Sequence, residues 1–124
     1  MLDGLVRRIA ARQRDARRRA EAMRKAVPAL AGELCARGAT RVVLFGSLAT
    51  GAPPHDRTDV DLCVEGLSDG AVALASLDLE AAFGIPVRVI CWEFASEPLR
   101  ELIRTYGEDV TVPASQRNFF RVTE

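Results

Sequence analysis

The stretch between residues 41 and 64 constrains the fold of this chain more than any other. It begins with RVVLF at 41–45, an apolar run with β-branched and aromatic residues that predicts a buried strand. Gly46 and Ser47 end that run, and a polar loop with two prolines follows. A second apolar run predicts another strand over 60–64. We therefore expect two neighbouring strands with a polar connection between them.

The remaining pattern alternates helices with strands. Apolar residues at spacings of three and four predict a helix over 2–26, which Pro28 is expected to interrupt or restart. Similar patterns predict helices that end near residue 36, start near residue 47 and cover 70–83 and 97–106. A third strand is expected over 86–92 and a short edge strand over 110–112. The order predicts an α/β (α+β) fold: a small mixed β-sheet flanked by helices, with a long N-terminal helix.

Length and composition favour one compact domain. The chain has 124 residues, of which 48% are hydrophobic, enough for a real core. It has no apolar run near the ~20 residues that span a bilayer and no signal-like stretch, so we expect a cytoplasmic protein without a membrane partner. Three widely spaced cysteines predict buried free thiols, and His55 is expected to be an ordinary solvated loop residue.

Charge is distributed unevenly along the chain. Residues 1–26 carry nine basic and three acidic side chains, a net charge of +6, and residues 27–124 carry a net charge of −6. Such a basic helix can bind nucleic acid or an acidic partner, or it can be a solvated face, which the lack of interleaved aromatic residues favours. We expect a basic helix at 1–26, the main domain at 27–112 and a tail at 113–124; association between copies of the chain stays open.

Two carboxylates open the second predicted strand. In a strand, alternate side chains point to opposite faces, so Asp59 and Asp61 share one face with Cys63. Their α-carbons are then about 7 Å apart. Hard oxygen ligands held in this way suit Mg²⁺, which keeps several waters and completes its shell with substrate phosphates.

The turn before these carboxylates suits a phosphate. Gly46 allows a sharp turn and a close approach of the backbone to a ligand. Ser47 supplies a hydroxyl, and a helix that starts there would direct free N–H groups at an anion. A phosphate cradle beside a carboxylate pair predicts a site for a metal-bound nucleoside triphosphate.

Together, "LFGSLATG" and the later "TDVDLCV" resemble the signature of the DNA polymerase beta-like nucleotidyltransferase superfamily, and more narrowly its minimal nucleotidyltransferases (MNT). The resemblance covers roughly residues 27–112. It implies a small mixed sheet flanked by helices, Mg²⁺ as cofactor, and transfer of a nucleotidyl group from a nucleoside triphosphate to a hydroxyl. Minimal members are often encoded beside a HEPN-domain protein, as antitoxin to toxin, and some modify that partner with AMP.

The resemblance also assigns roles to residues. It implies that Gly46 and Ser47 hold the β- and γ-phosphates and that Gly51 lets the loop fold over them. Asp59 and Asp61 would be the catalytic carboxylates and the metal ligands.

One position departs strongly from the family pattern. Arg88 stands on the third strand where members that catalyse transfer have a third carboxylate, whereas Thr58 for the usual serine is a mild change that keeps a hydroxyl to cap the turn. Arg88 could pair with Asp59 or Asp61 and disable the site, or it could clamp the nucleotide phosphates. Alternatively, Glu93 is the third acid, which would require a bulge in the strand.

Two functions therefore remain open. The first is magnesium-dependent transfer of a nucleotidyl group, AMP from ATP, to a hydroxyl acceptor such as a HEPN-type partner protein. The second is a catalytically impaired binding module that acts through a partner or through nucleic acid. Outside this site, Trp92 is expected in the core or an interface rather than against a base, and Phe119 and Phe120 are expected to dock on the body or a partner.

Overall fold

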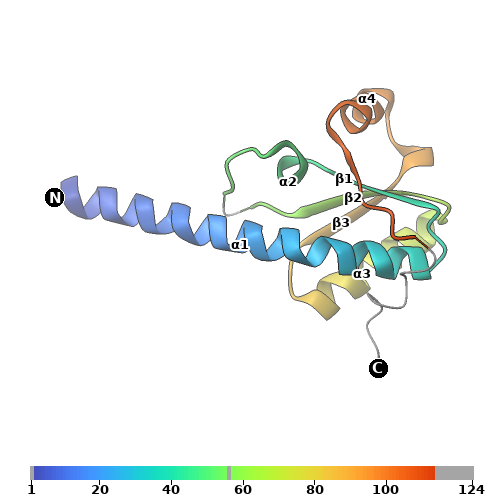
Figure 1. Cartoon of the computed structure of the whole chain (residues 1–124), viewed down its shortest axis with the longest axis horizontal. Helices are drawn as coiled ribbons and strands as arrows, with labels where there is room; N and C mark the ends of the chain where they lie inside the picture. The colour runs from blue at the N-terminus through green and yellow to red at the C-terminus, as the bar shows by residue number, and fades with distance from the viewer. Residues whose placement is uncertain (1, 56, 114–124) are drawn as a thin grey trace.

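The computed structural model describes residues 2–55 and 57–113 (Figure 1). Its helices and strands follow in this order: α1 (Leu2–Ala36), β1 (Arg41–Phe45), α2 (Ser47–Thr50), β2 (Val60–Glu65), α3 (Asp69–Phe83), β3 (Val87–Cys91), the 3₁₀ helix η1 (Trp92–Phe94), α4 (Glu97–Tyr106) and β4 (Glu108–Asp109). The predicted alternation of helices and strands is confirmed.

The strands form one mixed sheet in the order β3-β2-β1-β4. Strand β1 pairs antiparallel with both β2 and β4, whereas β2 and β3 are parallel. Helix α3 makes the crossover between the parallel strands, as a parallel connection requires. The predicted small mixed sheet is therefore present.

Helices cover the two faces of the sheet unequally (Figure 1). Val60, Leu62 and Val64 of β2 belong to the larger core cluster, together with apolar residues of α1 and α3. Cys63 lies on the other face, in a smaller cluster with Ile103 of α4. The predicted alternation along β2 is confirmed, and the smaller cluster leaves part of the second face for polar side chains.

Helix α1 is continuous through Pro28, so the predicted interruption there is wrong. A proline inside a helix removes one backbone hydrogen bond and costs about 3 kcal/mol. The turns that follow bury Leu30 and Leu34 completely against the sheet, and each buried leucine contributes about 1.5–3 kcal/mol. Tertiary packing therefore outweighs the local cost. The predicted segment boundary at residue 26 falls within this helix, and the division itself stays a prediction.

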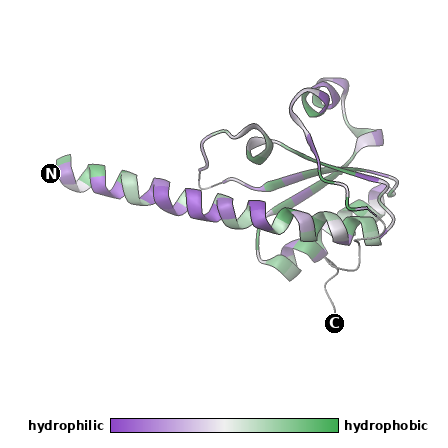
Figure 2. Cartoon of the chain, viewed as in Figure 1, coloured by the Kyte–Doolittle hydropathy of each residue, from purple (hydrophilic) through white to green (hydrophobic). Residues whose placement is uncertain are grey.

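The first half of α1 projects away from the sheet (Figure 1). Ala16 is the first buried residue of the helix. Figure 2 shows hydrophobic and hydrophilic residues alternating along the projecting part, where most of the basic residues of α1 lie. Among the residues that the structure describes, none of the helices is long and apolar enough to cross a membrane.

The edge strand lies two residues earlier than the predicted strand at 110–112, so that placement is wrong. Strand β4 is Glu108–Asp109, and the Val110 N–H then donates to the Val42 carbonyl at 2.9 Å. The Thr111 hydroxyl accepts from the Val42 N–H at 2.9 Å. This side chain takes the place of a backbone partner, which ends the regular ladder. Phe119 and Phe120 lie outside the described residues.

The three cysteines are free and buried, as predicted. Cys35 and Cys91 pack in the larger cluster and Cys63 in the smaller one. Burial raises the pKa of the Cys63 thiol to about 12. These residues therefore act as small apolar core residues.

Candidate nucleotide-binding site

The turn after β1 lies against the carboxylate pair. Gly46 has φ 76° and ψ −158°, a backbone conformation that is essentially restricted to glycine. A β-carbon at this position would collide with the Asp61 carboxylate. Strand pairing explains the contact, since Phe45 and Asp61 are register partners across β1 and β2. The structure thus brings together the glycine turn and the second aspartate.

Ser47 begins the single turn of α2. The Gly46 carbonyl accepts from the N–H groups of Ala49 and Thr50 at 3.1 and 3.2 Å. Gly51 ends the turn in the left-handed region, and its N–H donates to the Ser47 carbonyl at 3.1 Å. The predicted short helix is confirmed, and Gly51 is the residue from which the loop toward β2 departs.

Thr58 anchors the end of that loop. Its side chain is buried, and its hydroxyl accepts from the His55 N–H at 2.9 Å. The Thr58 N–H donates in return to the His55 carbonyl at 3.1 Å. The predicted capping role of this hydroxyl is confirmed. His55 is exposed, as predicted, and its Nδ1 accepts from the Arg57 N–H at 3.0 Å.

Asp61 is a buried acid, only 6% exposed. Loss of water around its carboxylate raises the pKa of Asp61 to about 6, and the charge of the neighbouring Asp59 carboxylate acts in the same direction. The cation of Arg88 opposes both effects. The structure therefore brings Asp59 and Asp61 close enough to interact, as their spacing predicts.

Arg88 is paired with Asp61. The two residues are register partners across the parallel strands β2 and β3. The Arg88 Nε lies 3.1 Å from Asp61 Oδ1 in an ion pair whose arginine side chain is 63% exposed. Glu93 is not an alternative third acid, because it lies in η1 beyond β3 and accepts from the Gly66 N–H at 3.3 Å. The sequence left three interpretations of Arg88 open, and the ion pair with Asp61 is the arrangement that the structure has.

The donor set fits one hard cation better than two. Asp59 and Asp61 supply carboxylate oxygens, which Mg²⁺ prefers. Residues 2–55 and 57–113 contain no group of three or more acidic, histidine or cysteine side chains arranged to hold a metal. Since Arg88 occupies the position opposite Asp61, its charge opposes a second divalent ion there. These residues do not fit a two-metal centre.

Arg24 connects α1 to this site, a role that sequence reasoning missed. Its guanidinium donates to the carbonyl of Leu48, the second residue of the α2 turn. Together with Arg17, Ser47 and Thr58, it borders a hollow of about 200 Å³ that is lined by α1, the α2 turn and the loop between α2 and β2. Helical spacing could have indicated this role. Residue 24 follows Ala20 by four and precedes Val27 by three, so it lies on the face of α1 that packs on the core.

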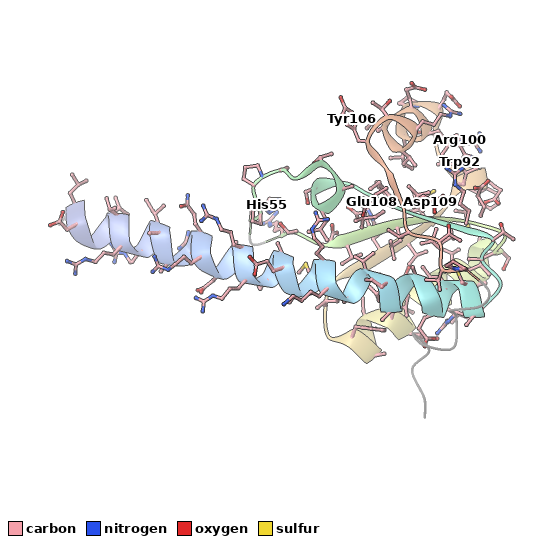
Figure 3. The ribbon with its side chains drawn as sticks, in the orientation of Figure 1. His55, Trp92, Arg100, Tyr106, Glu108 and Asp109 are labelled. Atoms are coloured by element: carbon pink, nitrogen blue, oxygen red, sulfur yellow. The ribbon has the colours of Figure 1, made fainter. Side chains whose placement is uncertain are left out.

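Trp92 lies away from the carboxylates. It packs against the smaller core cluster, and the guanidinium groups of Arg100 and Arg104 lie 5.0 and 5.3 Å from its ring centre. Figure 3 shows Trp92 and Arg100 together; the Arg100 Nη2 also donates to the Trp92 carbonyl at 2.8 Å. The predicted packing role of Trp92 is confirmed.

Several solved structures resemble this fold. One is a toxin–antitoxin complex with AMP-PNP, with 23% identity and a TM-score of 0.53 over 67% of this chain and 68% of that chain. A mutant of the toxin–antitoxin pair MntA–HpeT has 21% identity and a TM-score of 0.54, with the same coverage of both chains. At such identities, the likeness establishes the fold alone.

A sequence family gives the assignment. No curated protein matches the chain. Residues 27–108 match the family model described as a nucleotidyltransferase domain, and this segment includes the glycine turn, both aspartates and Arg88. The chain therefore belongs to the nucleotidyltransferase domain family.

Proposed function

We propose that this chain acts as an antitoxin-type partner of a HEPN protein. In this proposal the chain keeps the nucleotide cleft of its family but is impaired in nucleotidyl transfer. The Arg88–Asp61 ion pair carries this proposal. The HEPN partner follows from the resemblance to minimal nucleotidyltransferases, and ATP is the expected nucleotide. The similarity in fold to chains from two toxin–antitoxin structures supports the antitoxin-type role.

The charge of Arg88 is the physical reason for impaired transfer. In two-metal catalysis a third carboxylate helps to hold the catalytic ion and to activate the attacking hydroxyl. An arginine at this position changes the local charge from −1 to +1, and the guanidinium stays charged at any physiological pH. At about 4 Å and an effective dielectric constant near 20, each unit-charge contact is worth about 4 kcal/mol. Arg88 therefore repels a divalent ion and competes with it for Asp61.

The same cation favours an anionic ligand. The Arg88 side chain is largely exposed although its partner is buried, so the guanidinium can contact a phosphate without leaving the site. Gly46 lies beside the same carboxylate, and Ser47 is the next residue and starts the α2 turn. These contacts support a site that holds a triphosphate through the turn and through Arg88.

Magnesium-dependent transfer of AMP to the partner is the second candidate. It is favoured by the close approach of the Gly46 turn to Asp61, and of Asp61 to Asp59. In that case Asp59 and Asp61 would hold Mg²⁺, which supplies charge neutralisation on the phosphates. Arg88 would have to leave Asp61 when the metal binds.

One transfer assay separates the two candidates. The protein is incubated with labelled ATP, Mg²⁺ and the HEPN-type protein encoded beside it, and partner binding is measured separately by calorimetry. We expect the wild type to bind the partner without labelling it. Arg88→Asp should gain Mg²⁺ binding in calorimetry and leave partner binding unchanged.

The controls use the two aspartates. Label transfer by the wild type that disappears in both Asp59→Ala and Asp61→Ala would establish the second candidate and refute the first. Failure of Arg88→Asp to gain Mg²⁺ binding would show that Arg88 is not what opposes the metal. Absence of partner binding in the wild type would refute the antitoxin-type role itself.

A further inference from the structure

The projecting end of α1 carries an apolar stripe that nothing in the described structure covers. Leu2, Leu5, Val6 and Ile9 are each between 48% and 73% exposed. Their spacings of three, one and three place them on a single face of the helix. Scattered apolar residues on a surface are ordinary, but a stripe over two helical turns is typical of a helix that packs against another element.

This stripe continues the face by which α1 packs on the sheet. Farther along the helix the same face presents Ala16, Met23 and Val27, which are buried. The face is covered from Ala16 onward and exposed before it. The apolar stripe is thus part of a packing face that extends beyond the domain.

A hollow lies where the stripe meets the body. It has a volume of about 260 Å³ and lies between α1 and the loop that joins α2 to β2. It is bordered by Ile9, Arg12, Gln13, Ala16, Pro54 and His55. Figure 3 shows His55 on the loop beside α1. An apolar side chain of a segment lying along the stripe could enter this hollow.

The positive charge around the apolar stripe indicates what kind of partner segment can bind there. Residues 2–19 contain seven arginines and two aspartates, a net charge of +5. At 100° per residue, Arg8 and Arg12 flank one side of the stripe and Arg17 flanks the other. Two copies of this chain would bring two such basic segments together, which is unfavourable. Acidic residues beside an apolar stripe complement this surface.

We propose that residues 2–16 of α1 and the adjoining hollow form a docking surface for an amphipathic helix of a partner protein, with an apolar stripe flanked by Asp and Glu. A bilayer fits less well, because a flat surface cannot enter the hollow and residues 2–19 contain no aromatic anchor. Nucleic acid would engage the arginines without using the apolar stripe. The residues that border this hollow include none of Gly46, Asp61 and Arg88, so the proposal does not require nucleotide binding.

Two synthetic helices test the proposal with the full chain. Each is about three heptads long with leucine at the a and d positions; one has glutamate at the flanking positions and its twin has lysine. Binding is measured by fluorescence anisotropy. We expect the glutamate peptide to bind at least about tenfold more tightly than the lysine twin. The charge-swapped variant Arg8→Glu with Arg12→Glu should reverse that preference.

The apolar contribution has a matched control. Leu5→Glu with Ile9→Glu should lower the affinity for the glutamate peptide by about tenfold or more, since burial of two large side chains is lost. Arg7→Glu changes the net charge by the same two units on the opposite face and should lower it by less than about threefold. Thermal unfolding of each variant checks that the domain remains folded.

Three results would overturn the proposal. The first is equal affinity for the two peptides, or equal losses in the stripe variant and in Arg7→Glu. The second is no peptide binding, with binding instead to phosphatidylglycerol vesicles or to a duplex RNA. The third is a dimer in sedimentation velocity that the stripe variant dissociates, since a second copy would then cover the stripe. None of these outcomes depends on the transfer assay, so this proposal and the antitoxin-type role can fail separately.

Discussion

Gly46→Ala is the most direct test of the contact between the turn and Asp61. Gly46 has φ 76° and ψ −158°, a conformation that costs another residue about 1–3 kcal/mol. The new methyl group would also collide with a buried carboxylate, and such overpacking costs about 1–3 kcal/mol. We expect a loss of about 3 kcal/mol in the free energy of unfolding, measured by urea titration, and a fall of roughly 10 °C in Tm.

Gly51→Ala is the matched control for this change. Gly51 also has a positive φ, 73°, but a β-carbon there would meet no heavy atom within 4 Å. Only the left-handed backbone should cost energy, about 1–2 kcal/mol. In an Asp61→Ala background the collision at Gly46 is relieved, so Gly46→Ala should cost about 1 kcal/mol less than in the wild type. Equal costs at the two glycines, together with no coupling to Asp61, would refute the contact.

Three further tests address the burial of Asp61, the packing of the core and the link between α1 and α2. Burial raises the pKa of Asp61 from 3.8 to about 6, so the folded protein binds this proton more tightly than the unfolded chain does. The resulting stabilisation is fully present below pH 3.8 and is lost as the pH rises through 6. Asp61→Asn should therefore flatten the decline in unfolding free energy between pH 4 and 7 measured by urea titration, and an unchanged decline would exclude Asp61 as its source. Leu30→Ala, at a fully buried position, should cost about 2–5 kcal/mol; Ile9→Ala at the projecting end should change stability by less than about 0.5 kcal/mol, and similar Tm shifts for both would contradict the projecting helix. Arg24→Ala removes the donor to the Leu48 carbonyl and should cost about 1.5–3 kcal/mol, with faster amide exchange in the α2 turn; unchanged exchange would argue against that contact.

Local patterns predicted the parts of the site that depend on neighbouring residues. Alternation along β2 placed Asp59 and Asp61 on the face opposite the larger core, and the structure agrees. Glycine after an apolar strand predicted the turn, since few other residues adopt that backbone conformation. The position of Arg88 could also be predicted, but its ion pair with Asp61 depends on the register of two parallel strands, which the sequence of one strand does not determine.

Features that depend on distant contacts were missed. Pro28 has the same local cost in any helix, and only the sheet beneath α1 makes an uninterrupted helix favourable. The edge strand was misplaced because the Thr111 hydroxyl, a side-chain group, pairs with Val42 of another strand. Arg24 belongs to the basic segment that the sequence favours as a solvated face, yet its guanidinium donates to the Leu48 carbonyl, 24 residues away in the sequence. In each case the deciding partner is far away in the sequence.

The loop between α2 and β2 belongs to two surfaces at once. Pro54 and His55 border the hollow beside α1, and Thr58, tied to His55 by two hydrogen bonds, leads directly into Asp59. Two ligands that each favour one arrangement of this loop are coupled through it, positively where they favour the same arrangement and negatively where they favour different ones. Thermodynamic linkage then requires each ligand to change the affinity of the other by one common factor, which would let a protein bound at the helix tip report on the occupancy of the cleft.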